Sequence, residues 1–152
     1  MRKRLINDEA RGRAGDWLDL ETMARVEITS EEAEHPIESA LTGAGSGWRA
    51  SRPGDQIIRL LFDEPLRLRR ICLEFYDEIP RTQEFVLRWS PDQGRSYREI
   101  VRQQYRFSPP NTTREIENYA VDLREVTLLE LRITPDIHSG TANASLAQLR
   151  LA

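Results

Sequence analysis

From Val26 to its end, the chain is a series of short segments in which apolar and polar residues alternate. A period of two is typical of strands that bury one face and leave the other in water. Clusters of Gly, Pro, Asn, Asp and Ser separate the segments, and no sustained helical period intervenes. We therefore predict an all-β fold, an antiparallel β-sandwich of the jelly-roll kind with about eight strands.

The alternation also predicts which side chains face the core. In strand order they are Val26 and Ile28; Ile58, Leu60 and Phe62; Ile71, Leu73 and Phe75; Phe85, Leu87 and Trp89; Tyr97 and Val101; Tyr119 and Val121; Leu129, Leu131 and Ile133; Ala147, Leu149 and Leu151. Leu66 and Leu68 are out of phase with Ile71, which predicts a β-bulge near Arg69 and Arg70.

A chain of 152 residues is the size of one domain. We predict an N-terminal extension at residues 1–22, which is charged and lacks a period, and a sandwich domain at residues 23–152. The start has only Leu5 and Ile6 as an apolar stretch, too short for a secretory signal. The lone Cys72 forms no internal disulfide, so the expected location is the cytoplasm.

The charge pattern argues against two classes of partner. The net charge is −3, and the arginines are interleaved with acids, for example Arg98 and Arg102 around Glu99. Nucleic-acid binding depends on a basic surface, so we do not expect it. No apolar run approaches the ~20 residues that span a bilayer, and we do not expect a membrane partner.

The long connections are predicted to share one end of the sandwich. If consecutive strands are antiparallel, the short turns at 63–65, 91–96 and 122–127 lie at one end, and the longer segments 43–55, 77–83, 103–113 and 135–143 at the other. Long loops commonly carry binding sites. The candidate ligand-binding residues on this end are Trp48, Arg49, Arg52, Asp77, Arg81, Arg106, Asn111 and His138, with Glu78, Asp136 and Asn143 beside them.

This mixture suits a sugar or a polar protein partner. Guanidinium and carboxylate groups bind paired hydroxyls, and an aromatic ring covers the apolar face of a pyranose. We expect Arg52, Arg81 and Arg106 to be the main contacts and to be exposed loop residues whose removal changes stability little. Trp48 has an alternative role, because a Trp after a Gly-rich loop often closes the end of a sandwich core.

Two motif-like patterns are interpreted as structural, and the histidines do not form a catalytic pattern. Ser90, Asp92, Gly94, Ser96 and Tyr97 match an Asp-box hairpin, in which the Asp side chain binds backbone amides. The glycines at 43, 45 and 47 are interpreted as a flexible loop, because no helical pattern follows them. His35 and His138 fall in different loops, and no nucleophile elbow or metal-ligand spacing is present, so we do not expect an enzyme.

The order of elements resembles the discoidin or coagulation-factor C-type family of the galactose-binding-like superfamily. The resemblance runs from ITSEEAEHPIESALTGAGSGWRAS through QIIRLLFDEPLRLRRICLEFYD, FVLRWSPDQGRSY and LLELRITPD to ASLAQLRLA, over about residues 26–152. It implies a jelly-roll sandwich that binds glycans, phospholipid surfaces or other proteins.

Two departures from that family affect its ligands. Many glycan-binding members hold a structural calcium through an Asp before the Trp and a Glu in the last strand, whereas this chain has TGAGSGW and Gln148. Calcium requires several oxygens, usually carboxylates, so we expect no metal or other cofactor. Lipid-binding members carry apolar loop tips, and these loops are mostly charged. We therefore expect a non-catalytic, carbohydrate-binding module, with a cytoplasmic protein-interaction or self-association module, including a homo-oligomer, as the alternative.

Overall fold

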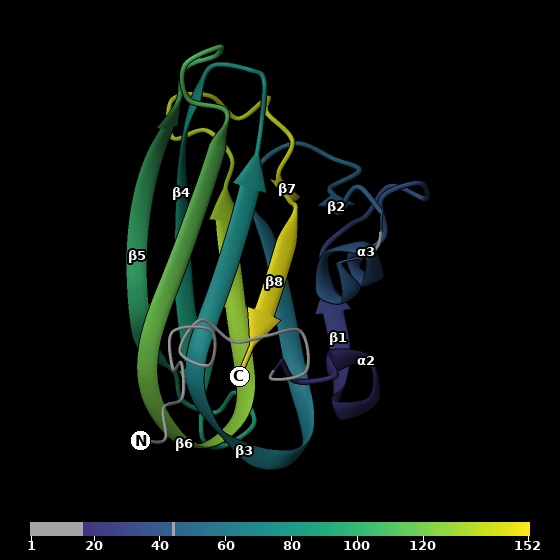
Figure 1. Cartoon of the computed structure of the whole chain (residues 1–152), viewed down its shortest axis with the longest axis vertical. Helices are drawn as coiled ribbons and strands as arrows, with labels where there is room; N and C mark the ends of the chain where they lie inside the picture. The colour runs from purple at the N-terminus through teal and green to yellow at the C-terminus, as the bar shows by residue number, and fades with distance from the viewer. Residues whose placement is uncertain (1–16, 44) are drawn as a thin grey trace, which may run out of the picture.

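The computed structural model describes residues 17–43 and 45–152. Within them, two short helices and eight strands follow one another as α2 (Leu20–Met23), β1 (Ala24–Ile28), α3 (Ile37–Thr42), β2 (Trp48–Arg49), β3 (Gln56–Tyr76), β4 (Arg81–Ser90), β5 (Arg98–Phe107), β6 (Arg114–Thr134), β7 (Ser145–Leu146) and β8 (Gln148–Leu151) (Figure 1). The prediction of an all-β, jelly-roll-like sandwich with about eight strands is confirmed.

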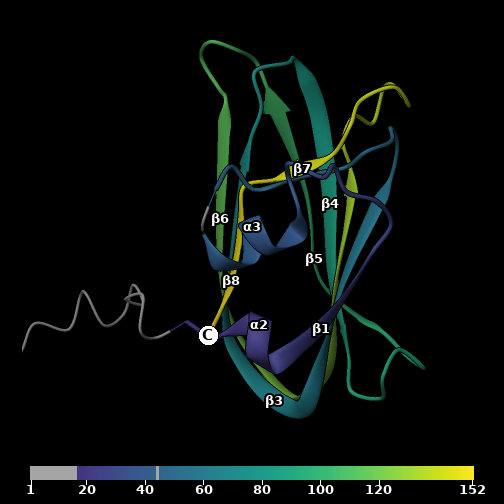
Figure 2. The ribbon, with the colours of Figure 1, turned by 90° about the vertical axis from the view of Figure 1, so that its right-hand side faces the viewer.

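The sandwich arises because two strands of 21 residues each belong to both layers. The strands are hydrogen-bonded in the order β1-β3-β6-β4-β5, and β8 pairs with β3. The first half of β3 pairs with β1 and with the last part of β6, from Ile58↔Leu131 outward. Its second half pairs with β8 and with the start of β6, as in Leu73↔Leu149 and Leu73↔Glu117. Figure 2 shows the resulting layers edge-on, with β6 and β8 opposite β4 and β1.

The side chains that alternate inward form the core. All eight residues on which the fold prediction most depends are buried, namely Ile58, Leu60, Phe62, Leu73, Phe75, Leu87, Leu131 and Leu149. Phe75 from one layer stacks on Phe85 from the other, with ring centroids 5.3 Å apart. The period of two therefore identified these core residues correctly. The prediction is wrong for Tyr97, which precedes β5 and lies against Arg88, 3.8 Å from its Cζ to the ring centroid, on the outer face beside Glu130.

Two predicted turns are wrong. Residues 63–65 and 122–127 lie inside β3 and β6, which bend there without ending. The register between the two strands shifts between Leu61 and Leu66 and twice more before Arg70, so the predicted bulge is confirmed. Pro65 falls in the first of these irregular stretches, where the missing N–H breaks no regular ladder bond.

Both helices, which the sequence analysis did not predict, cover the side of the sandwich between β1 and β8. Leu20 of α2 and Ile37, Ala40 and Leu41 of α3 are buried in the core. The predicted boundary at residue 22 falls inside α2, and the Leu18 N–H donates to the Leu151 carbonyl at 2.8 Å. The rest of the predicted extension, residues 1–16, lies outside the described residues.

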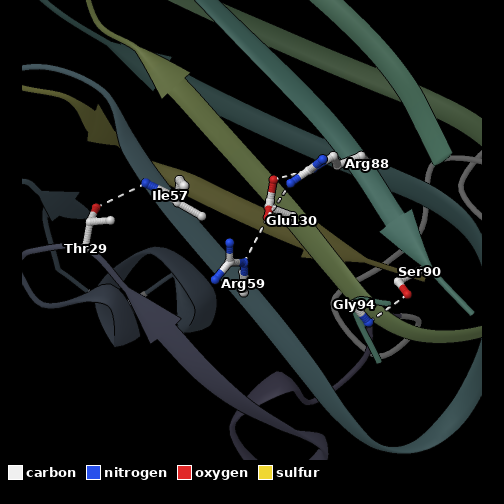
Figure 3. Close-up of polar contacts among 7 residues, drawn as sticks. All are labelled: Thr29, Ile57, Arg59, Arg88, Ser90, Gly94 and Glu130. Carbon is white, nitrogen blue, oxygen red and sulfur yellow. Dashed lines mark hydrogen bonds and ion pairs between the residues drawn. The ribbon is translucent and has the colours of Figure 1, made fainter. Parts of the chain in front are cut away.

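The hairpin from β4 to β5 has the internal hydrogen bonds of an Asp box. The Ser90 hydroxyl accepts from the Gly94 N–H at 2.8 Å (Figure 3), and the Asp92 carboxylate accepts from the Ser96 N–H and hydroxyl. The hydroxyls of Ser96 and Ser90 and the Ser96 N–H hold the pKa of Asp92 down at about 2. The structural interpretation of this motif agrees with these contacts.

No helix in the described part of the chain is long and apolar enough to cross a membrane.

Candidate functional site

The connections that follow β2, β3, β5 and β6 lie at one end of the sandwich, and the 91–97 hairpin lies at the other (Figure 1). Backbone hydrogen bonds join these loops: Asp77 N–H to Thr113 carbonyl at 2.9 Å, and Ala50 N–H to Ala144 carbonyl at 2.9 Å. The Gly54 N–H donates to the Ala142 carbonyl at 3.1 Å. The loops therefore form one connected surface. This agrees with the prediction that alternate connections between antiparallel strands lie at the same end of the sandwich.

An open hollow of about 450 Å³ lies on this surface. It is lined by Arg49, Asp77, Ile79, Pro80, Arg81, Asp136, Thr141, Ala142 and Asn143. Its volume is within the range of small-molecule sites. Three of the eight main predicted residues, Arg49, Asp77 and Arg81, come together here.

A buried ion pair forms the floor of the hollow. Arg81 Nε lies 2.8 Å from Asp77 Oδ2, and their side chains are 1% and 8% exposed. Arg81 Nη1 donates to the Asn143 carbonyl at 3.0 Å, and its Cζ lies 5.3 Å from the centroid of the Phe107 ring. The expectation that Arg81 is an exposed loop residue is wrong, because Arg81 begins β4 and its side chain points beneath the loops.

The two charges are close, but their hydrogen bonding is incomplete. Arg81 Nε is within ion-pair distance of Asp77, yet Nε and Nη2 have no hydrogen-bond partner of good geometry among the described residues. The two charges still attract each other, because charge attraction depends less on direction than a hydrogen bond does. Burial lowers the pKa of Arg81, and the Asp77 charge opposes that effect.

Above this floor, three side chains offer polar groups to a ligand. Arg49 is half-buried and lines the hollow together with Asp136. Asp136 Oδ1 accepts the His138 N–H at 3.1 Å. Asn143 donates its Nδ2 to the Ala50 carbonyl at 3.1 Å. An arginine, a carboxylate and an amide together bind hydroxyl groups well.

The structure places the other predicted residues elsewhere. Trp48 is only 1% exposed and its Nε1 donates to the Ser30 carbonyl at 3.0 Å, so its ring closes the core and does not cover a ligand. Arg106 lies on β5, which extends to Phe107, and so outside the loop predicted for it. Arg52, Asn111 and His138 are exposed at the loop end but do not line the hollow.

Four lining residues were not predicted: Ile79, Pro80, Thr141 and Ala142. Ile79 is 62% exposed, and its N–H donates to Asp77 Oδ1 at 3.0 Å. An apolar residue that a tight turn holds in water, as in the sequence Asp-Glu-Ile-Pro, is the signal that would have identified this part of the site.

A second hollow, of about 260 Å³, lies on the outer face of the larger sheet, which is the six-stranded sheet of β1, β3, β4, β5, β6 and β8. Its floor is Glu130, 1% exposed, which accepts from Arg59 Nε at 2.8 Å and from Arg88 (Figure 3). Burial raises the pKa of Glu130, but the hydrogen bonds from Arg88 and Arg59 outweigh it and the pKa is lowered. These charges satisfy one another, so the cluster needs no ligand to explain it.

The described residues contain one serine–histidine contact, but no carboxylate that would complete a catalytic triad. Ser46 Oγ lies 2.8 Å from His35 Nδ1, and both are at the surface. No acid is found to orient the other nitrogen of His35 in the described part of the chain, whereas an activated serine requires such an arrangement. Within the same residues, no group of three His, Cys, Asp or Glu side chains is placed to hold a metal ion.

No protein-family model matches the sequence, and no curated protein is similar to it in sequence. Solved structures are similar to it. CpGH89CBM32-5 from Clostridium perfringens, in complex with GalNAc-β-1,3-galactose, has a TM-score of 0.65 at 17% identity, covering 89% of this chain and 98% of its own. The family 32 carbohydrate-binding module of C. perfringens NanJ, in complex with galactose, has 0.61 at 16%, covering 89% and 96%. XRCC1 bound to the DNA polymerase β catalytic domain has 0.59 at 14%, covering 86% and 96%. The chain therefore has the β-sandwich fold of these domains.

Proposed function

We propose that the chain is a non-catalytic carbohydrate-binding module whose ligand occupies the loop-end hollow. The observation that carries the proposal is the hollow itself, about 450 Å³, which Arg49 and Asp136 line together with a buried ion pair. Two modules of the same fold were solved with galactose or a galactose-containing disaccharide, which supports a sugar as the ligand.

The lining suits one or two sugar rings. The Arg49 guanidinium donates to two neighbouring hydroxyls in a fixed geometry, and the Asp136 carboxylate accepts from them. Ile79 and Pro80 supply the apolar surface for the hydrogens on one face of the ring, because Trp48 is buried. With aliphatic side chains in place of an aromatic platform, we expect weak affinity, a Kd on the order of 0.1 to 1 mM.

The buried Arg81–Asp77 pair positions the site and does not itself touch the ligand. Through Nη1, Arg81 holds the Asn143 backbone, and Asp77 holds the Ile79 N–H and the Thr113 carbonyl. Each of these bonds fixes a different loop before any ligand arrives. A pre-ordered site loses less conformational freedom on binding.

The test is a glycan array with the purified chain, followed by calorimetry on the best glycan. Arg49→Ala and Asp136→Ala should each weaken binding about ten-fold or more, because each removes charged hydrogen bonds. Arg52→Ala is the matched control: Arg52 is an exposed arginine at the same end but outside the hollow, and its loss should leave the affinity unchanged.

Two results would contradict the proposal. One is binding that survives both Arg49→Ala and Asp136→Ala, which would move the site away from the hollow. The other is an array without any bound glycan at millimolar protein together with a partner protein that Arg49→Ala releases, which would make the loop end a protein-binding surface.

A further inference from the structure

The strand β1 is a free edge of the larger sheet. It pairs with β3 on one side only, and it lies at one end of the strand order β1-β3-β6-β4-β5. The Thr29 N–H donates to the Ile57 carbonyl, which makes Thr29↔Ile57 a hydrogen-bonded pair. Because such pairs alternate in an antiparallel ladder, Arg25 and Glu27 also bond to β3, and the N–H and C=O groups of Val26 and Ile28 point away from it.

Within the described residues, no backbone hydrogen bond uses those groups of Val26 and Ile28. The side chains of the same two residues are half-buried and face the inner side of the sheet. An edge of this kind presents both main-chain partners and apolar side chains to an added strand.

A groove of about 530 Å³ runs beside this edge, between β1 and the helices α2 and α3. It is lined by Leu20, Glu21, Ala24, Val26, Ile28, Glu31, Ile37, Glu38 and Leu41. Six of the nine residues are apolar and the other three are glutamates, with no arginine or lysine among them. Figure 2 shows α2, α3 and β1 together on this side of the molecule.

We propose that the β1 edge and this groove bind an extended peptide segment of a partner protein that has an apolar, uncharged centre and basic residues at both ends. The segment adds a strand to β1 through Val26 and Ile28, and the apolar side chains on its inner face enter the groove. Its basic ends extend beyond β1, where they meet the carboxylates of Glu21, which precedes β1, and of Glu31 and Glu38, which follow it. This surface is separate from the loop-end hollow, and the proposal does not depend on the glycan site.

A second copy of the chain fits this surface less well. Antiparallel pairing of two β1 strands about Val26 would match Arg25 with Glu27 on the outer face. The same arrangement would bring two grooves, each with three glutamates and no cation, to one seam. Like charges that meet without counter-charges are destabilising.

The test uses a fluorescein-labelled ten-residue peptide with two lysines at each end and alternating valine and threonine between them, titrated with the whole chain at low salt. We expect saturable binding that weakens as salt is added. The same peptide with glutamate for lysine should not bind, and neither should one with a central proline, which keeps the charges but removes a main-chain donor. In amide hydrogen exchange, the bound peptide should slow Val26 and Ile28, whereas Glu27 is protected beforehand by β3.

A matched pair of variants assigns the contact. Glu21→Gln with Glu38→Gln should weaken the peptide about five-fold. Glu78→Gln with Glu99→Gln removes the same charge from exposed positions away from β1, in the β3–β4 connection and on β5, and should change nothing. The proposal is overturned by no saturable binding at 1 mM chain, by equal effects of the two double variants, or by sedimentation of the free chain as a dimer whose formation slows exchange at Val26.

Discussion

At the scale of single residues, Glu115 makes stability depend on pH between about 4.5 and 8. Its side chain lies between the sheets and is 1% exposed, and its Oε1 accepts from Gln83 Nε2 at 3.3 Å. Its Oε2 has no hydrogen-bond partner in the described part of the chain. Burial, and then the negative charge of Glu117, raise the pKa of Glu115 from its ordinary 4.5 to about 8.

The direction of the pH effect follows from this shift. The folded state holds the proton of Glu115 up to about pH 8, whereas the unfolded chain releases it near pH 4.5. The stability that the neutral carboxyl provides is therefore complete below pH 4.5 and is lost as pH rises toward 8, by up to about 1.4 kcal/mol for each pH unit.

Glu115→Gln removes this titration. In urea unfolding, the variant and the parent chain should differ little at pH 4.5, and the variant should be more stable by a few kcal/mol at pH 8. The exposed Glu64→Gln serves as the control, with no change in the pH profile. Parallel profiles for Glu115→Gln and the parent would show that Glu115 ionises normally.

Arg81 is the second residue whose role differs from that of an exposed loop charge. Arg81→Ala leaves Asp77 buried without its counter-charge, and it should destabilise the fold by about 3–5 kcal/mol. Adding Asp77→Ala should recover part of that loss, because the pair is then removed together. Arg52→Ala should change the free energy of unfolding by less than about 0.5 kcal/mol. If Arg81→Ala costs no more than Arg52→Ala, the ion pair does not support the loops.

At the scale of elements, the strands were predictable in phase but not in extent. Asp63, Glu64 and Pro65 have the composition of a turn, and no local signal distinguishes a turn from a bend inside β3. The pairing decides it, since Leu66↔Val126 and Leu68↔Leu123 keep β3 and β6 together through the bend. These pairs join residues 60 and 55 positions apart in the sequence, and a period of two along one strand carries no information about such distant contacts.

The short β2–β7 pair provides a test of how tightly the loop end is closed. Gly47 has a φ of +84°, and a Cβ there would lie 2.5 Å from the Leu146 carbonyl oxygen and 2.8 Å from the Ala147 Cα. Gly54 has a similar φ of +90° but nothing within 4 Å. The interpretation of residues 43–47 as only a flexible loop is therefore wrong for Gly47, which is buried against β7.

These two glycines form a matched pair. Gly54→Ala should cost about 1–2 kcal/mol from backbone strain alone. Gly47→Ala carries the same strain and a clash with the backbone, and it should cost about 2 kcal/mol more. Thermal unfolding of both variants measures the difference. Equal losses would mean that the backbone at 146–147 moves freely, and that β2 and β7 do not hold the loop end together.

At the scale of the whole molecule, the sequence predicted the position of the candidate site better than its members. Loop lengths and strand parity placed the long connections at one end, which depends only on the antiparallel order. Burial of a polar group depends on a partner inside the fold. The Trp48 ring is buried with its Nε1 bonded to the Ser30 carbonyl, and the Arg81 side chain is buried with its charge paired to Asp77. The sequence does not show that Ser30 and Asp77 are these partners.

Calcium binding would affect the molecule as a whole, and the resemblance to discoidin-type domains raises the question. The loop before Trp48 has no acid, and the last strand has Gln148 where a carboxylate would be needed. A metal bound by the folded state at one hundred times its Kd would add about 2.7 kcal/mol to stability. We expect no such gain, so the thermal midpoint should be the same in a chelator and in millimolar calcium. A rise of several degrees with calcium, absent with magnesium, would reveal an oxygen-rich site built from backbone carbonyls, and the 43–55 loop would be the first place to seek it.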